Sequence, residues 1–80
     1  MHELGISRNI VAIVDEAAAG RRVRRVTLEI GKLSGVMAHA VRFCFDVAAH
    51  GTALEGAELE IRETAGEELN VRSMELEGAS

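Results

Sequence analysis

The chain has 80 residues, which is room for a single domain, residues 1–80, with one modest hydrophobic core. Hydrophobic residues make up 48%, charged residues make up 28% and proline is absent, a composition typical of folded globular proteins rather than disordered ones. The net charge of −4 has the wrong sign for a nucleic-acid or anionic-membrane partner, and no apolar run approaches the roughly 20 residues of a membrane span.

The first expected element is an amphipathic helix from Leu4 to Ala19. Its apolar residues recur at helical spacing and include Ile6, Ile10, Ile13, Val14 and Ala17. Gly20 follows as the residue expected to end this helix. Residues 26–30 then alternate between apolar and polar side chains, which predicts a half-buried strand that ends at Gly31.

A second helix is expected from Val36 to His50. Its polar side chains form one narrow stripe, made of His39, Arg42 and Asp46. Apolar side chains cover the rest of its surface, so we expect this helix to be buried on more than one side. Phe43 and Phe45, the only aromatic residues, both lie on it, which leaves no stacking platform for nucleic-acid bases.

Two further strands are expected after the second helix. Residues 57–62 alternate between apolar and charged side chains, and residues 67–77 form the last strand. The short connection at residues 63–67 predicts that these two strands form a hairpin. The order α-β-α-β-β indicates an α+β fold, in which two helices pack on one face of a small three-stranded sheet.

The apolar pattern of the last strand changes parity along its length. Leu69 and Val71 share one face, whereas Met74 and Leu76 have the opposite parity. A β-bulge near Ser73 would return all four side chains to the same face, and we therefore expect one there.

The residues that point most directly to chemistry are the first three, Met1, His2 and Glu3. An α-amine titrates at about 7.7–8.0 in model compounds, so the Met1 amine is available to a metal near neutral pH. This amine, the deprotonated amide nitrogen of His2 and His2 Nδ1 can bind one ion in a plane, which favours Ni(II) or Cu(II) over tetrahedral Zn(II). The Glu3 amide, His39, His50, water or another chain can fill the fourth position. The alternative is that His2 is an exposed terminal residue without a role.

Other reactive side chains indicate no enzyme. Cys44 is the only cysteine, which excludes an intrachain disulfide and a cysteine-based zinc site, and its apolar surroundings predict that it acts as a small hydrophobe. His39 and His50 are about 16 Å apart on one helix, too far to share an ion within a chain. No phosphate-binding loop or nucleophile motif is present. Because the N-terminus also lacks a signal-peptide pattern, we expect a cytoplasmic location.

Several blocks of this sequence resemble the HypA family of hydrogenase nickel-incorporation proteins. They are Met-His-Glu-Leu at residues 1–4, Leu-Glu-Ile-Gly-Lys-Leu-Ser-Gly-Val at 28–36, Val-Arg-Phe-Cys-Phe at 41–45, Gly-Ala-Glu-Leu-Glu-Ile at 56–61 and Glu-Leu-Asn-Val-Arg-Ser-Met-Glu-Leu at 68–76. The resemblance implies a nickel metallochaperone with a nickel role for Met1, His2 and Glu3. It also implies HypB, a nickel-handling GTPase, as partner, and the large subunit of nickel-iron hydrogenase as destination, with urease as a second beneficiary.

The sequence departs from the family pattern in two places. The family carries a zinc domain of two Cys-x-x-Cys pairs between its last two strands, whereas here only residues 63–67 stand in that position. The resemblance therefore implies a nickel-binding half without its zinc domain, and no zinc is expected in this chain. Met37 stands where the family commonly has an acidic residue, and a thioether does not replace that oxygen donor.

A different class of function also fits the sequence. The chain can be a metal-free interaction or assembly module that retains only the docking fold. Its broad apolar helix or an exposed strand edge would then mediate contacts, including a possible homodimer formed by strand exchange.

Overall fold

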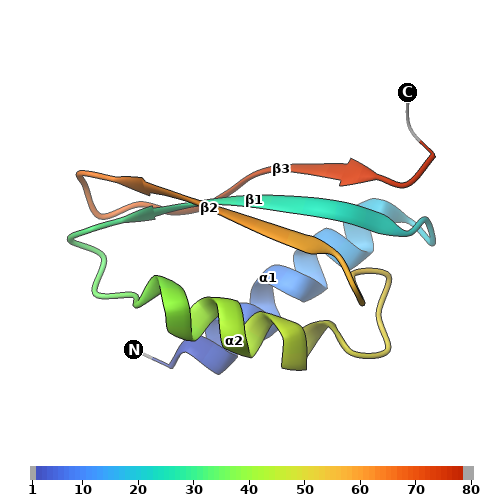
Figure 1. Cartoon of the computed structure of the whole chain (residues 1–80), viewed down its shortest axis with the longest axis horizontal. Coiled ribbons are helices and arrows are strands. Elements are labelled where there is room, and N and C mark those ends of the chain that lie inside the picture. The colour runs from blue at the N-terminus through green and yellow to red at the C-terminus, as the bar shows by residue number, and fades with distance from the viewer. Residues whose placement is uncertain (1, 79–80) are drawn as a thin grey trace.

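The computed structural model of the chain describes residues 2–78. Its helices and strands are, in chain order, α1 (Glu3–Ala18), β1 (Val23–Gly31), α2 (Ala38–Ala49), β2 (Glu58–Thr64) and β3 (Leu69–Leu76). The two helices lie side by side on one face of the three-stranded sheet (Figure 1). The predicted α+β fold and its element order are therefore confirmed.

The strand order, β2-β1-β3, places β1 in the centre of the sheet. β1 and β2 are parallel, and α2 forms the crossover between them, as parallel neighbours require. β3 pairs antiparallel with the other side of β1. The predicted hairpin between residues 57–62 and 67–77 is therefore wrong, because β2 and β3 lie on opposite edges of the sheet and are not neighbours.

A short loop carries the chain from β2 to β3 across the end of β1. Three backbone hydrogen bonds hold it there: Gly31 N donates to Glu68 O at 2.7 Å, Lys32 N to Thr64 O at 2.9 Å and Leu33 N to Gly66 O at 2.9 Å. Because β1 also ends at this edge, these bonds satisfy backbone groups that the sheet itself leaves unpaired.

The predicted bulge in β3 is confirmed. Thr27 of β1 lies opposite Ser73 while the next residue, Leu28, lies opposite Val71, so Arg72 is the extra residue on β3. Pairing continues as Val26 with Met74, which returns the apolar side chains of β3 to one face. All four of them, Leu69, Val71, Met74 and Leu76, pack against the core.

The core lies between the helices and the sheet. Its most completely buried large side chains are Phe45, Leu28, Leu54, Val26 and Val41. Ser7 of α1 is also fully buried, and its hydroxyl donates a hydrogen bond to Val41 O at 3.3 Å, which joins α1 to α2. The apolar stripe predicted for α1 is wrong in part, because Ile13 is 62% exposed and Ala17 is exposed.

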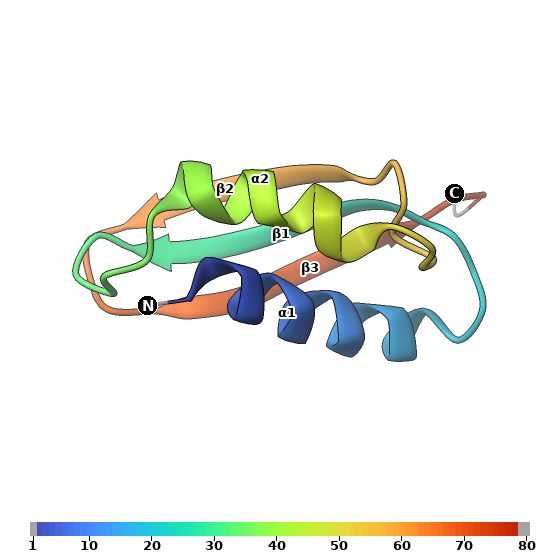
Figure 2. The ribbon, with the colours of Figure 1, turned by 90° about the horizontal axis from the view of Figure 1, so that it is seen from below.

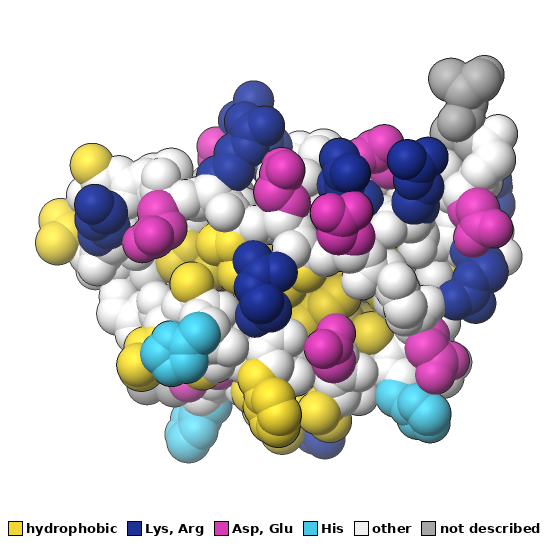
Figure 3. Space-filling model, viewed as in Figure 1, with side chains coloured by type: hydrophobic (Ala, Val, Ile, Leu, Met, Phe, Trp, Pro, Cys, Tyr) yellow, Lys and Arg dark blue, Asp and Glu magenta, His cyan; other side chains and the backbone are white. Residues whose placement is uncertain are grey.

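α2 is buried along one stripe only. Val41, Phe45 and Ala49 face the core, whereas Phe43 is 73% exposed and Val47 is 52% exposed. The expectation that this helix is buried on more than one side is therefore wrong, since the described part of the chain has one helical layer and no further layer covers it. Figure 3 shows hydrophobic side chains on the outer surface of this helical layer.

The face of the sheet opposite the helices carries paired charges. Arg25 contacts both Glu58 and Glu75 at 3.2 Å, and Arg72 contacts Glu29 at 2.9 Å. These exposed pairs make this face polar. Among the described residues, no helix combines the length and the apolar character that crossing a bilayer requires.

Candidate metal centre

The two helices begin at the same end of the molecule. Figure 2 shows that α1 and α2 run in the same direction, with both N-terminal ends close to the end of β1. One hydrogen bond joins these ends, since the backbone N–H of Met37 donates to Glu3 Oε2 at 3.4 Å. The structure therefore brings the start of the chain to the first turn of the second helix.

His2 is the N-cap residue of α1, and its side chain is exposed and makes no capping hydrogen bond. Its backbone is extended, with φ −90° and ψ 95°. The His2 carbonyl oxygen accepts the first hydrogen bond of the helix, from Ile6 N at 3.0 Å. The imidazole thus makes no capping hydrogen bond, while the backbone of the residue is held by the helix. Met1, the other main donor predicted, lies outside the described residues.

The backbone at this point is suited to metal binding through nitrogen. The first four N–H groups of an α-helix have no acceptor within the helix, and the amides of His2 and Glu3 are among them. Deprotonation of the His2 amide by a metal therefore breaks no hydrogen bond of α1. His2, the described part of the donor set predicted from the sequence, is therefore not engaged through its amide by the helix.

The Glu3 carboxylate is engaged by backbone donors. A hydrogen bond from its own backbone N–H, and then the one from Met37 N, lower the pKa of the Glu3 carboxyl below its usual range. This carboxylate is therefore ionised at neutral pH and points toward α2. Sequence reasoning missed the contact, because Glu3 and Met37 are 34 residues apart. The one available signal was the residue type of Met37. A methionine side chain cannot cap a helix, so the start of α2 needs an acceptor from another residue.

The two other histidines lie at opposite ends of α2. His39 is exposed in the first turn, at the same end as His2. His50 follows the last turn, and its Nδ1 lies 3.0 Å from Glu55 Oε2. Of the predicted alternatives for a fourth ligand within the chain, His39 thus lies at the same end as His2, and His50 does not.

Side chains alone do not form a metal site in the described part of the chain. Residues 2–78 contain no group of three or more His, Cys, Asp or Glu side chains placed to hold an ion. Cys44 is half-buried on α2. The described side chains by themselves therefore provide no metal site.

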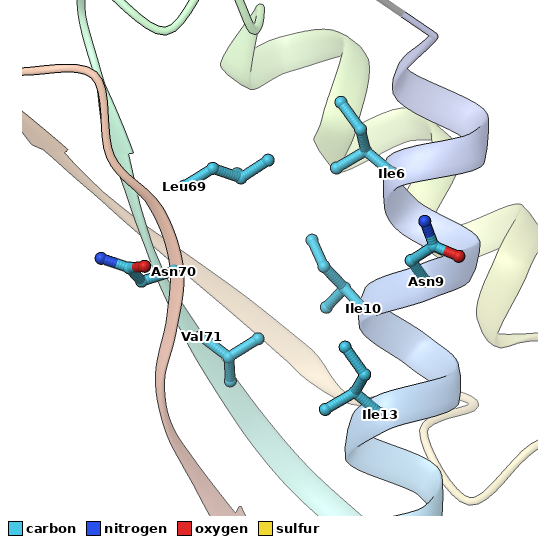
Figure 4. A pocket seen from close by; sticks show the side chains of 7 residues that line it. All are labelled: Ile6, Asn9, Ile10, Ile13, Leu69, Asn70 and Val71. Atoms are coloured by element: carbon cyan, nitrogen blue, oxygen red, sulfur yellow. The ribbon is translucent and has the colours of Figure 1, made fainter.

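One pocket is a groove between α1 and β3, of about 490 Å³. Ile6, Ile10 and Ile13 point from the helix toward Leu69 and Val71 on the strand (Figure 4). Two asparagines complete its lining and no titratable side chain contributes to it. General acid and base chemistry has no groups to use in this groove.

Comparison with known proteins connects this arrangement to a family. Residues 1–68 match the family model described as HypA, a hydrogenase/urease nickel incorporation metallochaperone. The chain is 65% identical over 66 residues to a hydrogenase maturation factor HypA of Nostoc sp., covering 82% of this chain and 58% of the relative. A HypA of Geobacter sulfurreducens is 50% identical over 66 residues, covering 82% and 60%.

The fold agrees with that of a solved relative. The solution structure of the Ni metallochaperone HypA from Helicobacter pylori matches with a TM-score of 0.73 at 22% identity, covering 80% of this chain and 58% of that one. The chain spans somewhat over half the length of these relatives, and β3 lies beyond the residues that match the family model. The family description is that of a metal carrier and not of an enzyme, and the chain belongs to the HypA family of nickel metallochaperones.

Proposed function

We propose that this chain binds one Ni(II) ion at its N-terminus and delivers it during the maturation of nickel-iron hydrogenase. The donors are the α-amine of Met1, the amide nitrogen of His2 and His2 Nδ1. The observation that best supports this site is the position of His2, which is an exposed N-cap residue whose amide has no acceptor in the helix. The family description, nickel incorporation for hydrogenase or urease, names the same metal.

This donor set suits a carrier. Three nitrogens bind the ion in one plane, and the fourth position is open to the Glu3 amide, His39, water or a group from the receiving protein. An entering ligand from the receiver can occupy that position before the amine and imidazole leave, so nickel is never released into water. The transfer is ligand exchange: the His2 amide nitrogen takes up a proton as nickel leaves it, and no bond between heavy atoms forms or breaks in either protein.

The proposed partners are the GTPase HypB and the large subunit of nickel-iron hydrogenase, with urease as a second beneficiary. Exposed apolar side chains support docking to another protein. Phe43 and Val47 on the outer side of α2 are more than half exposed, and Leu33 and Met37 are exposed near the end where nickel would bind. We place this exchange in the cytoplasm, where both proposed partners would meet it.

We further propose that residues 1–80 act as a single nickel-binding domain without a zinc site. The connection from Glu63 to Glu67 is too short to contain a zinc domain, and Cys44 is the only cysteine. Zinc sites of the family type use two Cys-x-x-Cys pairs, and this chain supplies none. Nickel is therefore the only metal in this proposal.

The test is a Ni(II) titration of the untagged protein, followed by calorimetry and visible absorption, beside His2→Ala. We expect one ion per chain with the yellow, diamagnetic spectrum of planar Ni(II), and loss of both in the variant. A copy whose Met1 amine is acetylated should lose binding as well, because acetylation removes the terminal amine as a donor. Equal weak binding by all three proteins would rule out this site.

A metal-free assembly module is the second candidate, and the exposure of Phe43 and Val47 is the observation that favours it. Strand exchange to a homodimer belongs to this proposal, because β3 is an edge strand of the sheet that residues 2–78 form, and its outer side has no neighbour there. Sedimentation of the wild type and the His2→Ala variant separates the two functions. An assembly module would have the same oligomeric state in both and would not respond to nickel.

A further inference from the structure

The two edge strands of the sheet differ in how the surrounding side chains contact them. At β2, the guanidinium of Arg42 on α2 donates a hydrogen bond to Leu59 O at 2.6 Å. Within residues 2–78, no side chain forms a hydrogen bond with the backbone of β3. The outer edge of β3 is therefore the edge that is open to a further strand.

The pairing of β3 with β1 determines which backbone groups face this open edge. Gly31 N donates to Glu68 O at 2.7 Å, and the antiparallel register continues without a break through Leu69, Asn70 and Val71. Residues of an antiparallel strand alternate between hydrogen-bonded and non-hydrogen-bonded positions. Asn70 therefore directs its N–H and C=O toward β1, whereas Leu69 and Val71 direct theirs away from β1, to the open edge.

A strand added at this edge would also cover apolar side chains. Its residues opposite Leu69 and Val71 would point to the same face of the sheet as these two, which is the face that α1 covers. There they would enter the groove in which Ile6, Ile10 and Ile13 point toward β3 (Figure 4). The groove is open to solvent, since Ile13 is 62% exposed. Two aliphatic side chains at positions i and i+2 of the added strand therefore fit this edge.

Charge favours a segment of another protein over a second copy of this chain. Glu67 and Glu68 directly precede the strand, are exposed and form no salt bridge within residues 2–78. In the antiparallel register that matches all four apolar residues of β3 with those of a copy, Glu68 of each chain would lie opposite Glu77 of the other. Like charges directly opposite are unfavourable, whereas a segment with basic residues after its aliphatic pair would be attracted.

We propose that the open edge of β3 binds an extended segment of a partner protein as a fourth strand, antiparallel to β3. The segment has two aliphatic residues at positions i and i+2, which enter the groove beside α1, followed by two basic residues that lie beside Glu68 and Glu67. Backbone hydrogen bonds with Leu69 and Val71 provide affinity, and the side chains provide specificity. This surface uses none of the proposed nickel donors and requires no metal.

The test measures binding of the synthetic peptide Thr-Val-Thr-Val-Lys-Lys to the wild-type chain. The peptide is acetylated and amidated, so its ends carry no charge. In the antiparallel arrangement its valines lie opposite Val71 and Leu69, and its lysines lie opposite Glu68 and Glu67. A second peptide with both valines N-methylated keeps the side chains but lacks the two backbone donors. A third peptide has glutamates in place of the lysines, which reverses the charge.

Two protein variants complete the comparison. Ile13→Ser removes an exposed aliphatic side chain from the groove, and Ala12→Ser places the same new residue at an exposed position on α1 that does not line the groove. Both positions are exposed, so both variants should fold. Binding is measured by calorimetry, and hydrogen exchange of the β3 amides is measured by NMR.

We expect one peptide per chain, with binding about tenfold weaker in Ile13→Ser and unchanged in Ala12→Ser. The N-methylated peptide should not bind, and the glutamate peptide should bind at least about fivefold more weakly at low salt. The peptide should slow exchange of the Leu69 and Val71 amides, which face the open edge. The Asn70 amide faces β1 and should exchange slowly with and without the peptide.

Equal binding of the N-methylated and parent peptides would overturn the proposal, because strand addition requires the backbone donors. Absence of binding at about 1 mM peptide would also overturn it. Slow exchange of Leu69 and Val71 in the protein alone, together with a dimer in sedimentation, would overturn it in favour of a second copy at this edge. None of these measurements involves nickel, so failure of the proposed function and failure of this proposal are distinguishable.

Discussion

Gly31, the last residue of β1, lies directly against Gly66 in the loop that crosses the sheet from β2 to β3. A Cβ atom on Gly31 would be 2.1 Å from Gly66 O, and the atoms it meets belong to the backbone and cannot rotate away. The φ angle of Gly31 is not in the left-handed region, so space alone requires glycine here. This contact allows the chain to pass from one edge of the sheet to the other.

Gly31→Ala should therefore destabilise the protein by about 1–3 kcal/mol, because the crossing loop must shift and strain its hydrogen bonds. Gly5→Ala is the control, since its added Cβ has ordinary clearance and alanine favours a helix by roughly 0.5–1 kcal/mol. Denaturant unfolding of both variants measures the difference. Equal stability of Gly31→Ala and the wild type would contradict the crossing seen here.

The two phenylalanines of α2 should respond very differently to truncation. Phe45 is 1% exposed and Phe43 is 73% exposed, although they are only two residues apart. Phe45→Ala removes a core side chain and should cost about 3–5 kcal/mol of unfolding free energy. Phe43→Ala should stay within about 0.5 kcal/mol of the wild type. Thermal and denaturant unfolding provide the measurement, and similar losses from both changes would mean that Phe43 is covered in solution.

The end of α1 contains a position where glycine should be better than the natural residue. Ala19 has a φ of 52°, the left-handed conformation that costs an alanine roughly 1 kcal/mol or more. Ala19→Gly should therefore raise the unfolding free energy by up to about 1 kcal/mol. Ala12→Gly, at an exposed position inside the same helix, should lower it by about the same amount. Effects of equal sign in the two variants would refute the assignment of this helix end.

One contact should make stability depend on acid pH. The Thr64 hydroxyl donates a hydrogen bond to Glu68, and this bond is the main cause that lowers the pKa of the Glu68 carboxyl. Because the folded pKa is below the unfolded value of about 4.3, the unfolded state takes up the proton first as the pH falls. The contribution is complete above that value and is lost as the pH falls through the folded pKa.

Thr64→Val removes the donor at nearly constant shape, so it should lower stability at pH 7 and have progressively less effect between about pH 5 and pH 3. Denaturant unfolding of both proteins across this range makes the comparison. The effect should be small and reduced by salt, because Glu68 is exposed. A difference between the two proteins that does not change with pH would show that the bond is absent in solution.

The proposed nickel site also predicts a dependence on pH. Binding must displace a proton from the His2 amide and, below about pH 7.7, from the terminal amine, so affinity should rise by more than about tenfold per pH unit between pH 6.5 and 7.5. Calorimetry in buffers of different ionisation enthalpy counts the protons released. Acetylation of Met1 provides the control and should abolish binding. Affinity independent of pH would require a different donor set.

Local sequence patterns were sufficient for the elements themselves. Alternation at residues 26–30 and 57–62 placed β1 and β2, and the change of parity between Val71 and Met74 indicated the bulge that the structure has at Arg72. The bulge could be predicted because Leu69 and Met74 can face the same side of the sheet only if an extra residue stands between them. The site at Met1, His2 and Glu3 was likewise expected from donor chemistry and from the family resemblance, and stays a prediction.

Contacts between residues that are distant in the sequence could not be predicted from such local patterns. The short connection from Thr64 to Leu69 suggested a hairpin because its length permits one, but length does not reveal that β1 already occupies the position next to β2. The exposure of Phe43 and Ile13 was missed for a related reason. An apolar side chain on a helix is buried only if another layer of the fold covers it. The hydrophobic periodicity of a helix does not reveal how many layers the fold has.

What the amino-acid sequence alone determined is local: the helix and strand periods, the bulge, and a terminal His2 whose donors are adjacent by covalent structure. The tertiary structure decided the relations that depend on spatial proximity. These are the central place of β1, the crossing at Gly31 and the bond from Met37 to Glu3 across 34 residues of chain. Such relations depend on how layers pack and on which edge of the sheet is free, and no short stretch of sequence contains both partners.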